Sequence, residues 1–308
     1  MGRRSVGRRA VGLALQGVIV VAFIVGSATP ALAAKPTVRG SHGGGGGGSA
    51  TPTGNDVSYP QCGTSLPAAP AFGIVGVTGG LANDLNPCFG PSKTYPRYTQ
   101  SELYWAVTSS VGGTSQPKAS LYVNTADPGN VYNGTVVKDW PTSSMSTDPY
   151  TSCNATTVTL TSGTATVGAN SRACAWQYGY DKATQDASWL GAAASAINKL
   201  TGAASVPGTA ASYPWWLDVE TANTWQTDTA MNVADLTGMV AGLEAAGAGT
   251  GTVGVYSTSS QWDSITGGAR RLRRDRFTRF PTGSPEHETS PARRPTARRR
   301  PSPEAPSP

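Results

Sequence analysis

The chain has 308 residues, of which 14% are charged, and its formal net charge is +6 at pH 7. The positive charge lies at the two ends, because residues 36–268 carry 8 Lys and Arg against 14 acidic residues. A negatively charged central part without a basic stripe excludes a nucleic-acid-binding role for it, and we expect no nucleic-acid partner.

The first 54 residues have the pattern of an export signal followed by a linker. Two arginine pairs precede an apolar run over residues 10–28, and Ala31-Leu-Ala33 follows as a small-residue cleavage site. We therefore expect residues 1–33 to be a signal peptide and the protein to be secreted, with wall association as an option. The sequence does not distinguish the Sec from the twin-arginine route. An uncleaved membrane anchor is the alternative, since the run is close to spanning length. Residues 34–54, with six consecutive glycines, are expected to be a flexible linker.

Strands and helices are expected to alternate over residues 55–268. Apolar runs bounded by Gly, Asn or Asp predict strands at residues 72–77, 118–123, 215–219 and 253–256. Helices are predicted at residues 102–107, 181–200 (with Asp181 as N-cap) and 229–246, and another opens at Gln261. This repetition predicts an α/β fold with a parallel sheet covered by helices. Residues 156–167 differ and predict a small hairpin inserted on the surface.

Four cysteines are present: Cys62, Cys88, Cys153 and Cys174. An even number in an exported chain predicts two disulfides. Three pairings are possible, and the short spacings favour Cys62–Cys88 and Cys153–Cys174. A zinc site is the alternative, but the chain has no Cys-x-x-Cys pair and no histidine near these residues, so no metal is expected.

The two histidines narrow the possible chemistry. They are His42 and His287, so none falls within residues 55–268. This distribution excludes a Ser-His-Asp triad, a Cys-His dyad and a His-ligated metal from the predicted domain. If the domain is an enzyme, we expect its proton transfers to use carboxylates, without a cofactor.

Asp218 and Glu220 close the predicted strand at residues 215–219. Residues two apart on a strand point to the same face, so these two carboxylates are expected to lie side by side. Two adjacent carboxylates can divide the work of a glycosidase, one protonated and one ionised. The alternative is an acid pair that only caps the following helix.

Five segments together resemble the first five strands of the glycoside hydrolases of family 25, the lysozyme-type muramidases: residues 55–59, 72–80, 119–124, 216–220 and 254–258. The more specific parts are Asp56-Val-Ser58 and Leu217-Asp-Val-Glu220. The resemblance covers about residues 55–268. It implies a (β/α) TIM-barrel-like domain that is incomplete here, with about five of eight strands, and carries the disulfide-closed hairpin as an insertion.

The resemblance also implies roles for individual residues. Glu220 would be the general acid, Asp218 the carboxylate that stabilises or assists at the anomeric carbon, and Asp56 a third acid at the end of the first strand. The substrate-binding side chains, for which ordinary packing is the alternative, would be Trp225, Tyr256, Asn124 and Tyr122. The implied activity is hydrolysis of β-glycosidic bonds in peptidoglycan or another polysaccharide. The rivals are an inactive wall-binding protein with the same fold and a non-functional truncated product.

The composition changes abruptly after Gly268, where a sixth strand would be due. Residues 269–308 contain 11 Arg and 8 Pro and no apolar run. We expect this tail to be disordered and out of frame with the domain before it. The alternatives are a genuine basic tail that holds anionic wall polymers and a nucleic-acid-binding tail.

Overall fold

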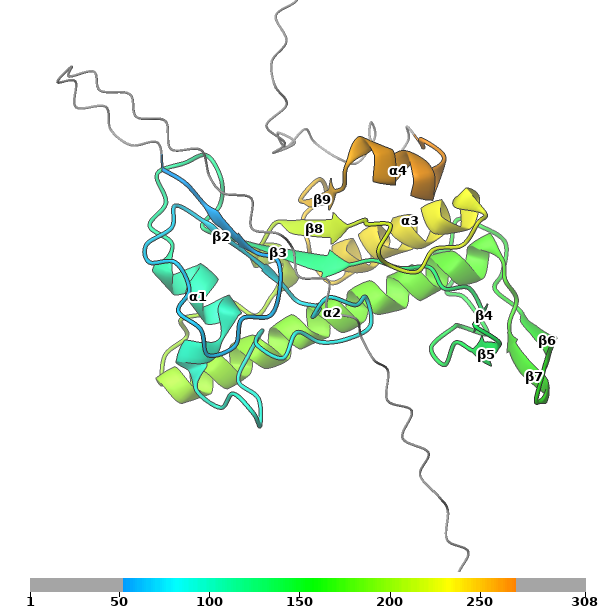
Figure 1. Cartoon of the computed structure of the whole chain (residues 1–308), viewed down its shortest axis with the longest axis horizontal. Helices are drawn as coiled ribbons and strands as arrows, with labels where there is room; N and C mark the ends of the chain where they lie inside the picture. Colours follow the sequence, from blue (N-terminus) through cyan, green and yellow to red (C-terminus); the bar gives the residue numbers. More distant parts are fainter. Residues whose placement is uncertain (1–51, 270–308) are drawn as a thin grey trace, which may run out of the picture. The chain divides into compact units, whose positions relative to one another are not determined.

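The computed structural model describes residues 52–269. The predicted signal peptide, most of the linker and nearly all of the Arg/Pro-rich tail lie outside the described residues. The described part is mixed α/β, and its main feature is a five-stranded sheet in the order β1-β2-β3-β8-β9 (Figure 1). All four neighbouring pairs in this sheet are parallel, as predicted.

The sheet strands are β1 (Asn55–Val57), β2 (Gly73–Gly76), β3 (Ala119–Asn124), β8 (Trp215–Asp218) and β9 (Val253–Tyr256). The longer helices are α1 (Glu102–Ser109), α2 (Arg172–Thr201), α3 (Thr229–Ala245) and α4 (Ser259–Thr266). Two short 3₁₀ helices are η1 (Tyr98–Gln100) and η2 (Ala210–Ser212). Two antiparallel pairs complete the list, β4 (Val131–Tyr132) with β5 (Thr135–Val136) and β6 (Ala155–Leu160) with β7 (Gly163–Gly168).

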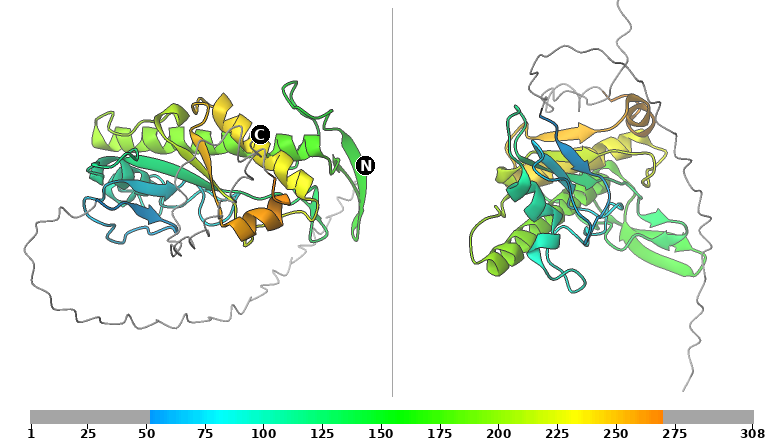
Figure 2. Two further views of the ribbon diagram at one scale, coloured as in Figure 1. Left: turned by 90° about the horizontal axis from the view of Figure 1, so that it is seen from above. Right: turned by 60° about the vertical axis from the view of Figure 1, so that its left-hand side comes forward.

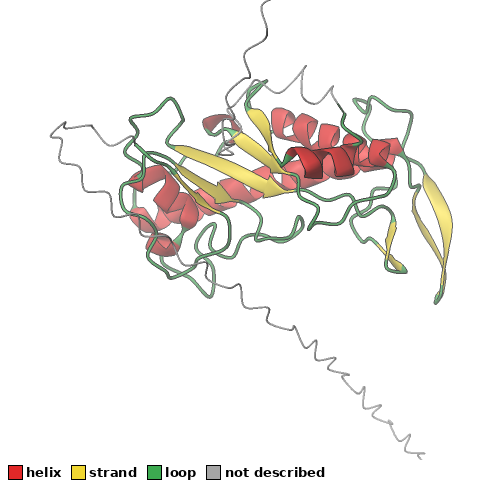
Figure 3. Cartoon of the chain, turned by 45° about the horizontal axis from the view of Figure 1, so that its top comes forward, coloured by secondary structure: helices red, strands yellow, loops and turns green. Residues whose placement is uncertain are grey.

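Helices α1, α2 and α3 cover one face of the sheet, as Figures 2 and 3 show. Leu121 of β3 and Leu217 of β8 point to this face and are fully buried in the main core. Helices α2 and α3 pack very closely, because Gly238 of α3 lies directly against the backbone of Trp176 in α2. Any side chain at Gly238 would displace one helix from the other, so the glycine sets the spacing of this layer.

The other face of the sheet carries two rows of residues that the strand register aligns. In strand order the first row consists of Gly76, Tyr122, Trp216 and Gly254. The second row lies nearer the carboxyl ends of the strands and consists of Asn124, Asp218 and Tyr256. Alternation along each strand separates them from the buried leucines of the helix-covered face. The polar row therefore lies at the edge where parallel strands end, and this edge positions the candidate site.

Both predicted disulfides are confirmed. Cys62 pairs with Cys88 and Cys153 with Cys174, with Cα–Cα distances of 5.0 and 4.6 Å. The predicted hairpin is also confirmed as β6–β7, and Cys153 and Cys174 join its root to the first turn of α2. The second disulfide therefore fixes an exposed ribbon to the helix that lines the core.

The start of α2 was predicted wrongly. The helix begins at Arg172 and not at Asp181, and its N-cap is Ser171, whose hydroxyl accepts a hydrogen bond from the backbone N–H of Cys174 at 3.3 Å. Asp181 lies within the helix and accepts from the side chain of Gln177 at 2.7 Å. The aromatic residues of the first turns disfavour helix in isolation, and burial against α3 overrides that preference.

The five strands form an open sheet in the described residues, and no closed barrel is seen among them. Within residues 52–269, none of the helices has the length and apolarity needed to cross a lipid bilayer.

Candidate active site

Two of the three acids predicted from the sequence lie at the carboxyl end of β8, and the charge of the third acts on Asp218. Asp218 is the last residue of β8, Glu220 follows two residues later, and Asp56 is the middle residue of β1. The half-buried side chains of Asp218 and Glu220 alternate with the fully buried Val219, as expected for residues on one face. The structure therefore places Asp218 of the acid pair within range of the charge of a third carboxylate, which lies on the edge strand β1.

Burial, together with the negative charges of Glu220 and Asp56, raises the pKa of Asp218 to about 7. Partial desolvation also raises the pKa of Asp56, although this residue stays open to solvent. Carboxylates that repel one another resist simultaneous ionisation, so the cluster retains a proton near neutral pH. A retained proton close to an ionised carboxylate is the condition that acid-assisted glycoside cleavage requires.

Asp218 is held by its neighbours through both backbone and side chain. Its backbone carbonyl accepts hydrogen bonds from the hydroxyl and the N–H of Thr125 at 2.8 and 3.2 Å. Asn124 donates from Nδ2 to Oδ2 of Asp218 at 2.9 Å. The other carboxylate oxygen, Oδ1, is buried and has no hydrogen-bond partner among the described residues. One oxygen of this carboxylate is therefore held by Asn124, and the hydrogen-bonding capacity of the other is unused.

The backbone around Glu220 is anchored on both sides. The indole N–H of Trp225 donates to the carbonyl oxygen of Glu220 at 2.8 Å. The N–H of Val219 donates to the carbonyl of Tyr256 at 2.9 Å, and the N–H of Thr221 donates to Oε1 of Gln261 at 2.7 Å. These bonds continue the strand geometry past the end of β8, which keeps Glu220 beside Asp218.

The predicted sugar-binding aromatics have different surroundings. Tyr122 is only 8% exposed, and its hydroxyl donates to the carbonyl of Val57 at 3.3 Å. Burial raises its pKa, and the charges of Asp56 and Asp218 raise it further. Trp225 is half-buried and packs against the main core. Tyr256 is 56% exposed at the end of β9, so among these three rings it is the most open to a ligand.

Trp216 was not predicted as a site residue. It lies on the same face of the sheet as Asp218, two residues earlier on β8. Its ring lies over Gly254 of β9, where an added Cβ would come within 2.7 Å of the ring. Gly254 therefore allows the indole to lie flat on the sheet. The i, i+2 spacing from Trp216 to Asp218 was the signal that could have identified it.

A cavity of about 370 Å³ opens among the loops that follow β2, β3 and β8. Amides, small residues and one aromatic line it: Leu81, Ala82, Asn83, Asp84, Ala126, Pro128, Tyr132, Val137, Ala222, Asn223 and Thr224. These loops leave the same edge of the sheet as the acid cluster. The cavity was not predicted, because it depends on three segments that are distant in sequence.

Further acids are buried away from the cluster, and none was predicted from the sequence. Asp127 accepts from the side chain of Gln226 at 2.7 Å and the N–H of Gly129 at 3.2 Å, and burial raises its pKa to about 6. Asp235 on α3 and Asp186 on α2 are fully buried, and burial raises the pKa of both well above the usual value. In the described residues no group of three or more His, Cys, Asp and Glu side chains is arranged to hold a metal ion.

Comparisons with known proteins point to one family. A family model described as "Lysozyme-like protein 1" matches residues 192–278, which include β8, Asp218, Glu220 and β9. The chain is 43% identical over 53 residues to the "Probable GH family 25 lysozyme 4" of Dictyostelium discoideum. That match covers 17% of this chain and 23% of the relative, so the chain matches about a quarter of the relative's length. No solved structure matches significantly. The resemblance to the lysozymes of glycoside hydrolase family 25 is therefore confirmed, as a partial and distant one.

Proposed function

We propose that this protein is a cell-wall-directed glycoside hydrolase that cleaves β-glycosidic bonds in peptidoglycan. One observation carries the proposal: Asp218 and Glu220 lie on one face at the end of β8, where burial and neighbouring charge raise the pKa of Asp218 to about 7. The partial likeness to a family 25 lysozyme supports the same reaction class.

In the proposed reaction Glu220 protonates the oxygen of the leaving sugar. Asp218 in its ionised form stabilises the positive charge that develops at the anomeric carbon. Water then attacks this carbon and gives a proton back to Glu220, so the bond to the leaving sugar is replaced by a bond to the water oxygen. Asp56 adds negative charge to the cluster, and this charge raises the pKa of Asp218. Peptidoglycan is proposed as the substrate because the relative is described as a lysozyme.

We also propose a (β/α) TIM-barrel-like architecture around the described sheet, with residues 55–268 as the hydrolase domain. Support comes from the parallel order of the five strands and from the position of the acids, since barrel enzymes build their sites at the carboxyl ends of strands. The proposed contacts to sugar rings come from Tyr256, Trp225, Asn124 and Tyr122.

Export of the protein is part of the proposal. The two disulfides are compatible with an oxidising compartment, and residues 1–33 have the composition of a signal peptide. The substrate would then be met outside the membrane, where the wall polymer lies.

The test is digestion of purified peptidoglycan by the full chain, with the new reducing ends labelled by borohydride. We expect release of soluble fragments whose reduced termini are derived from an amino sugar of the glycan strand. Release of peptide without new reducing ends would contradict the proposal. Sedimentation of the protein with walls in the absence of any release would establish the alternative, a wall-binding protein without turnover.

A further inference from the structure

Three polar side chains on successive strands form a chain of hydrogen bonds that ends on Asp218. Thr78 follows β2 and is completely buried, Asn124 ends β3, and Asp218 ends β8. Oγ1 of Thr78 accepts from the backbone N–H of Asn124 at 2.7 Å. The amide oxygen of Asn124 accepts from Oγ1 of Thr78 at 3.2 Å and from the N–H of Gly80 at 3.3 Å.

The direction of these bonds follows from the groups around the amide of Asn124. The N–H of Gly80 can only donate and an ionised Asp218 can only accept, so the amide oxygen faces Gly80 and the NH₂ faces Asp218, where Nδ2 lies 2.9 Å from Oδ2. In this orientation the single hydrogen of the Thr78 hydroxyl points at the amide oxygen, while Oγ1 accepts the backbone N–H of Asn124. The reverse orientation would set the amide oxygen against a carboxylate and the NH₂ against the N–H of Gly80.

We propose that Thr78 is a positioning residue for Asp218: its hydroxyl donates to the amide oxygen of Asn124 and so holds Nδ2 of the amide on Oδ2 of the carboxylate. The role of Asp218 in the reaction rests on the function proposed above. Thr78 contacts Asn124 and not the carboxylate, so it acts on Asp218 only through the amide.

The hydrogen bond from Asn124 lowers the pKa of Asp218, whereas the other groups around it raise this pKa. Burial raises the pKa of Asp218, and the charges of Glu220 on the same segment and Asp56 on β1 act in the same direction. Tyr122 on β3 and Tyr256 on β9 also face the cluster and are affected by its charge. An N–H donated to a carboxylate favours its ionised form. Thr78 therefore keeps Asp218 more easily ionised than its buried position would allow.

The experiment compares Thr78→Val with Thr78→Ser in the full chain. Valine keeps the shape and removes the hydroxyl, whereas serine keeps the hydroxyl. The pKa of Asp218 is read by NMR titration of ¹³C-labelled aspartate carboxyls, with Asp218→Asn used to assign the resonance. We expect Thr78→Val to raise the pKa of Asp218 by about half a unit to one unit, the size of one modest hydrogen bond, and Thr78→Ser to titrate like the wild type.

Wall hydrolysis gives the second measurement. In Thr78→Val the acidic limb of the pH–rate profile should move to higher pH by the same amount, and Thr78→Ser should restore it. An unchanged pKa in Thr78→Val, or an equal rise in both variants, overturns the proposal. If the valine variant does not fold, Thr78→Ala removes the same hydroxyl and is read in the same way.

The two proposals can fail separately. The NMR titration needs no activity, so a wild-type chain that cannot cleave walls refutes the proposed function and leaves the test of Thr78 intact. Conversely, if the wild type cleaves walls and Thr78→Val leaves the pKa of Asp218 unchanged, only the positioning role is refuted.

Discussion

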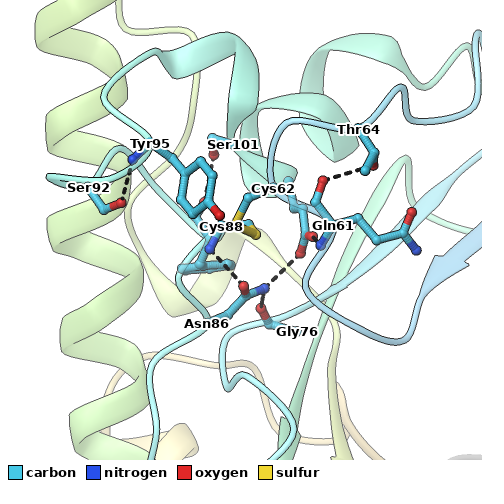
Figure 4. Close-up of a disulfide and its surroundings, with 11 residues drawn as sticks. Gln61, Cys62, Thr64, Gly76, Asn86, Cys88, Ser92, Tyr95 and Ser101 are labelled. Atoms are coloured by element: carbon cyan, nitrogen blue, oxygen red, sulfur yellow. Dashed lines mark hydrogen bonds between the residues drawn. A yellow bond between two sulfur atoms is a disulfide. The ribbon is translucent and has the colours of Figure 1, made fainter.

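Glu102 and Asp218 are both carboxylates at the sheet, but their hydrogen bonding differs. Glu102, at the start of α1, is completely buried, and each of its oxygens accepts a bond: Oε1 from the N–H of Gln61 and Oε2 from the side chain of Asn86, both at 2.7 Å. Asn86 also donates to the carbonyl of Gly76 and accepts from the N–H of Cys88, each at 2.8 Å (Figure 4). Asp218 has one bonded oxygen and one without a partner in the described chain.

This difference separates a carboxylate whose hydrogen bonds hold the fold together from one whose hydrogen-bonding capacity is only partly used. Burial raises the pKa of Glu102, and its hydrogen bonds with Gln61 and Asn86 lower it again. These bonds join β2, α1 and the Cys62–Cys88 loop. Asp218 has only the bond from Asn124 to lower its pKa, and the charges of Glu220 and Asp56 raise the pKa in the same direction as burial. A buried acid with an unpartnered oxygen is costly, which is tolerated where the group is needed for function.

An unpartnered oxygen alone is not sufficient evidence of a site. Asp235 is completely buried, and neither of its carboxylate oxygens has a hydrogen-bond partner among the described residues. It lies on α3, beside Gly179 of α2 and away from the open face of the sheet. Asp218 differs because it combines the unpartnered oxygen with two neighbouring acids at the strand ends.

The largest expected effect comes from Asp218→Asn. We expect wall hydrolysis to fall by about two orders of magnitude or more, because the neutral amide cannot stabilise a developing positive charge. The folded pKa of Asp218 is raised to about 7, so its ionisation costs stability as the pH rises through that value. At pH 8 the variant should therefore unfold at no lower denaturant concentration than the wild type. If activity and stability fell together, Asp218 would have to be regarded as a structural carboxylate like Glu102.

Glu102→Gln should give the opposite result. An amide can offer only one oxygen to the two donors, Gln61 and Asn86, so one buried donor loses its partner. We expect the free energy of unfolding to fall by about 2 kcal/mol. Activity per folded molecule should be retained. Denaturant unfolding and wall hydrolysis check this together, with the exposed Asp263→Asn on α4 as the matched carboxyl-to-amide control. A variant with normal stability and lost activity would place Glu102 in the chemistry.

Asp127→Asn should give the smallest effect, one that depends on pH. The folded pKa of Asp127 is raised to about 6, so the stability linked to its protonated form is present below pH 3.8 and is lost as the pH rises through 6. Asparagine can still accept from Gln226 and Gly129 without carrying a charge. We expect the free energy of unfolding to rise by about 1–2 kcal/mol at pH 8 and to stay unchanged at pH 3.5, as measured by denaturant unfolding. Equal gains at the two pH values would contradict this explanation.

Much of the fold could be predicted from local sequence, because the relevant signals are local. The apolar runs before Thr78 and Asn124 predicted β2 and β3. The run over residues 215–219 predicted β8, which ends at Asp218. The cysteine spacings gave both disulfides, since each closes a short loop. The start of α2 was missed because tertiary packing, not propensity, decides the helical state of its aromatic first turns.

The surroundings of the site could be predicted only in part. Asp218 and Glu220 were recognisable from their position at the end of a predicted strand, and Asp56 from the resemblance to the family 25 glycoside hydrolases. The bond from Thr78 to Asn124 spans 46 residues, and that from Gln61 to Glu102 spans 41, so nothing in the local pattern indicated either. Such distant partners decide whether an acid has both oxygens hydrogen-bonded, as Glu102 does, or keeps one oxygen without a partner, as Asp218 does.

The central claim is that the carboxylate pair at the end of β8 cleaves the glycan, and Glu220→Gln tests it most directly. The measurement is the rate at which new reducing ends form in purified peptidoglycan, for the wild type, Glu220→Gln and the control Asp263→Asn. The account predicts a fall of about two orders of magnitude or more in Glu220→Gln, because the proton donor is lost while the shape is kept. It predicts no change in Asp263→Asn. Wild-type activity in Glu220→Gln would contradict the account.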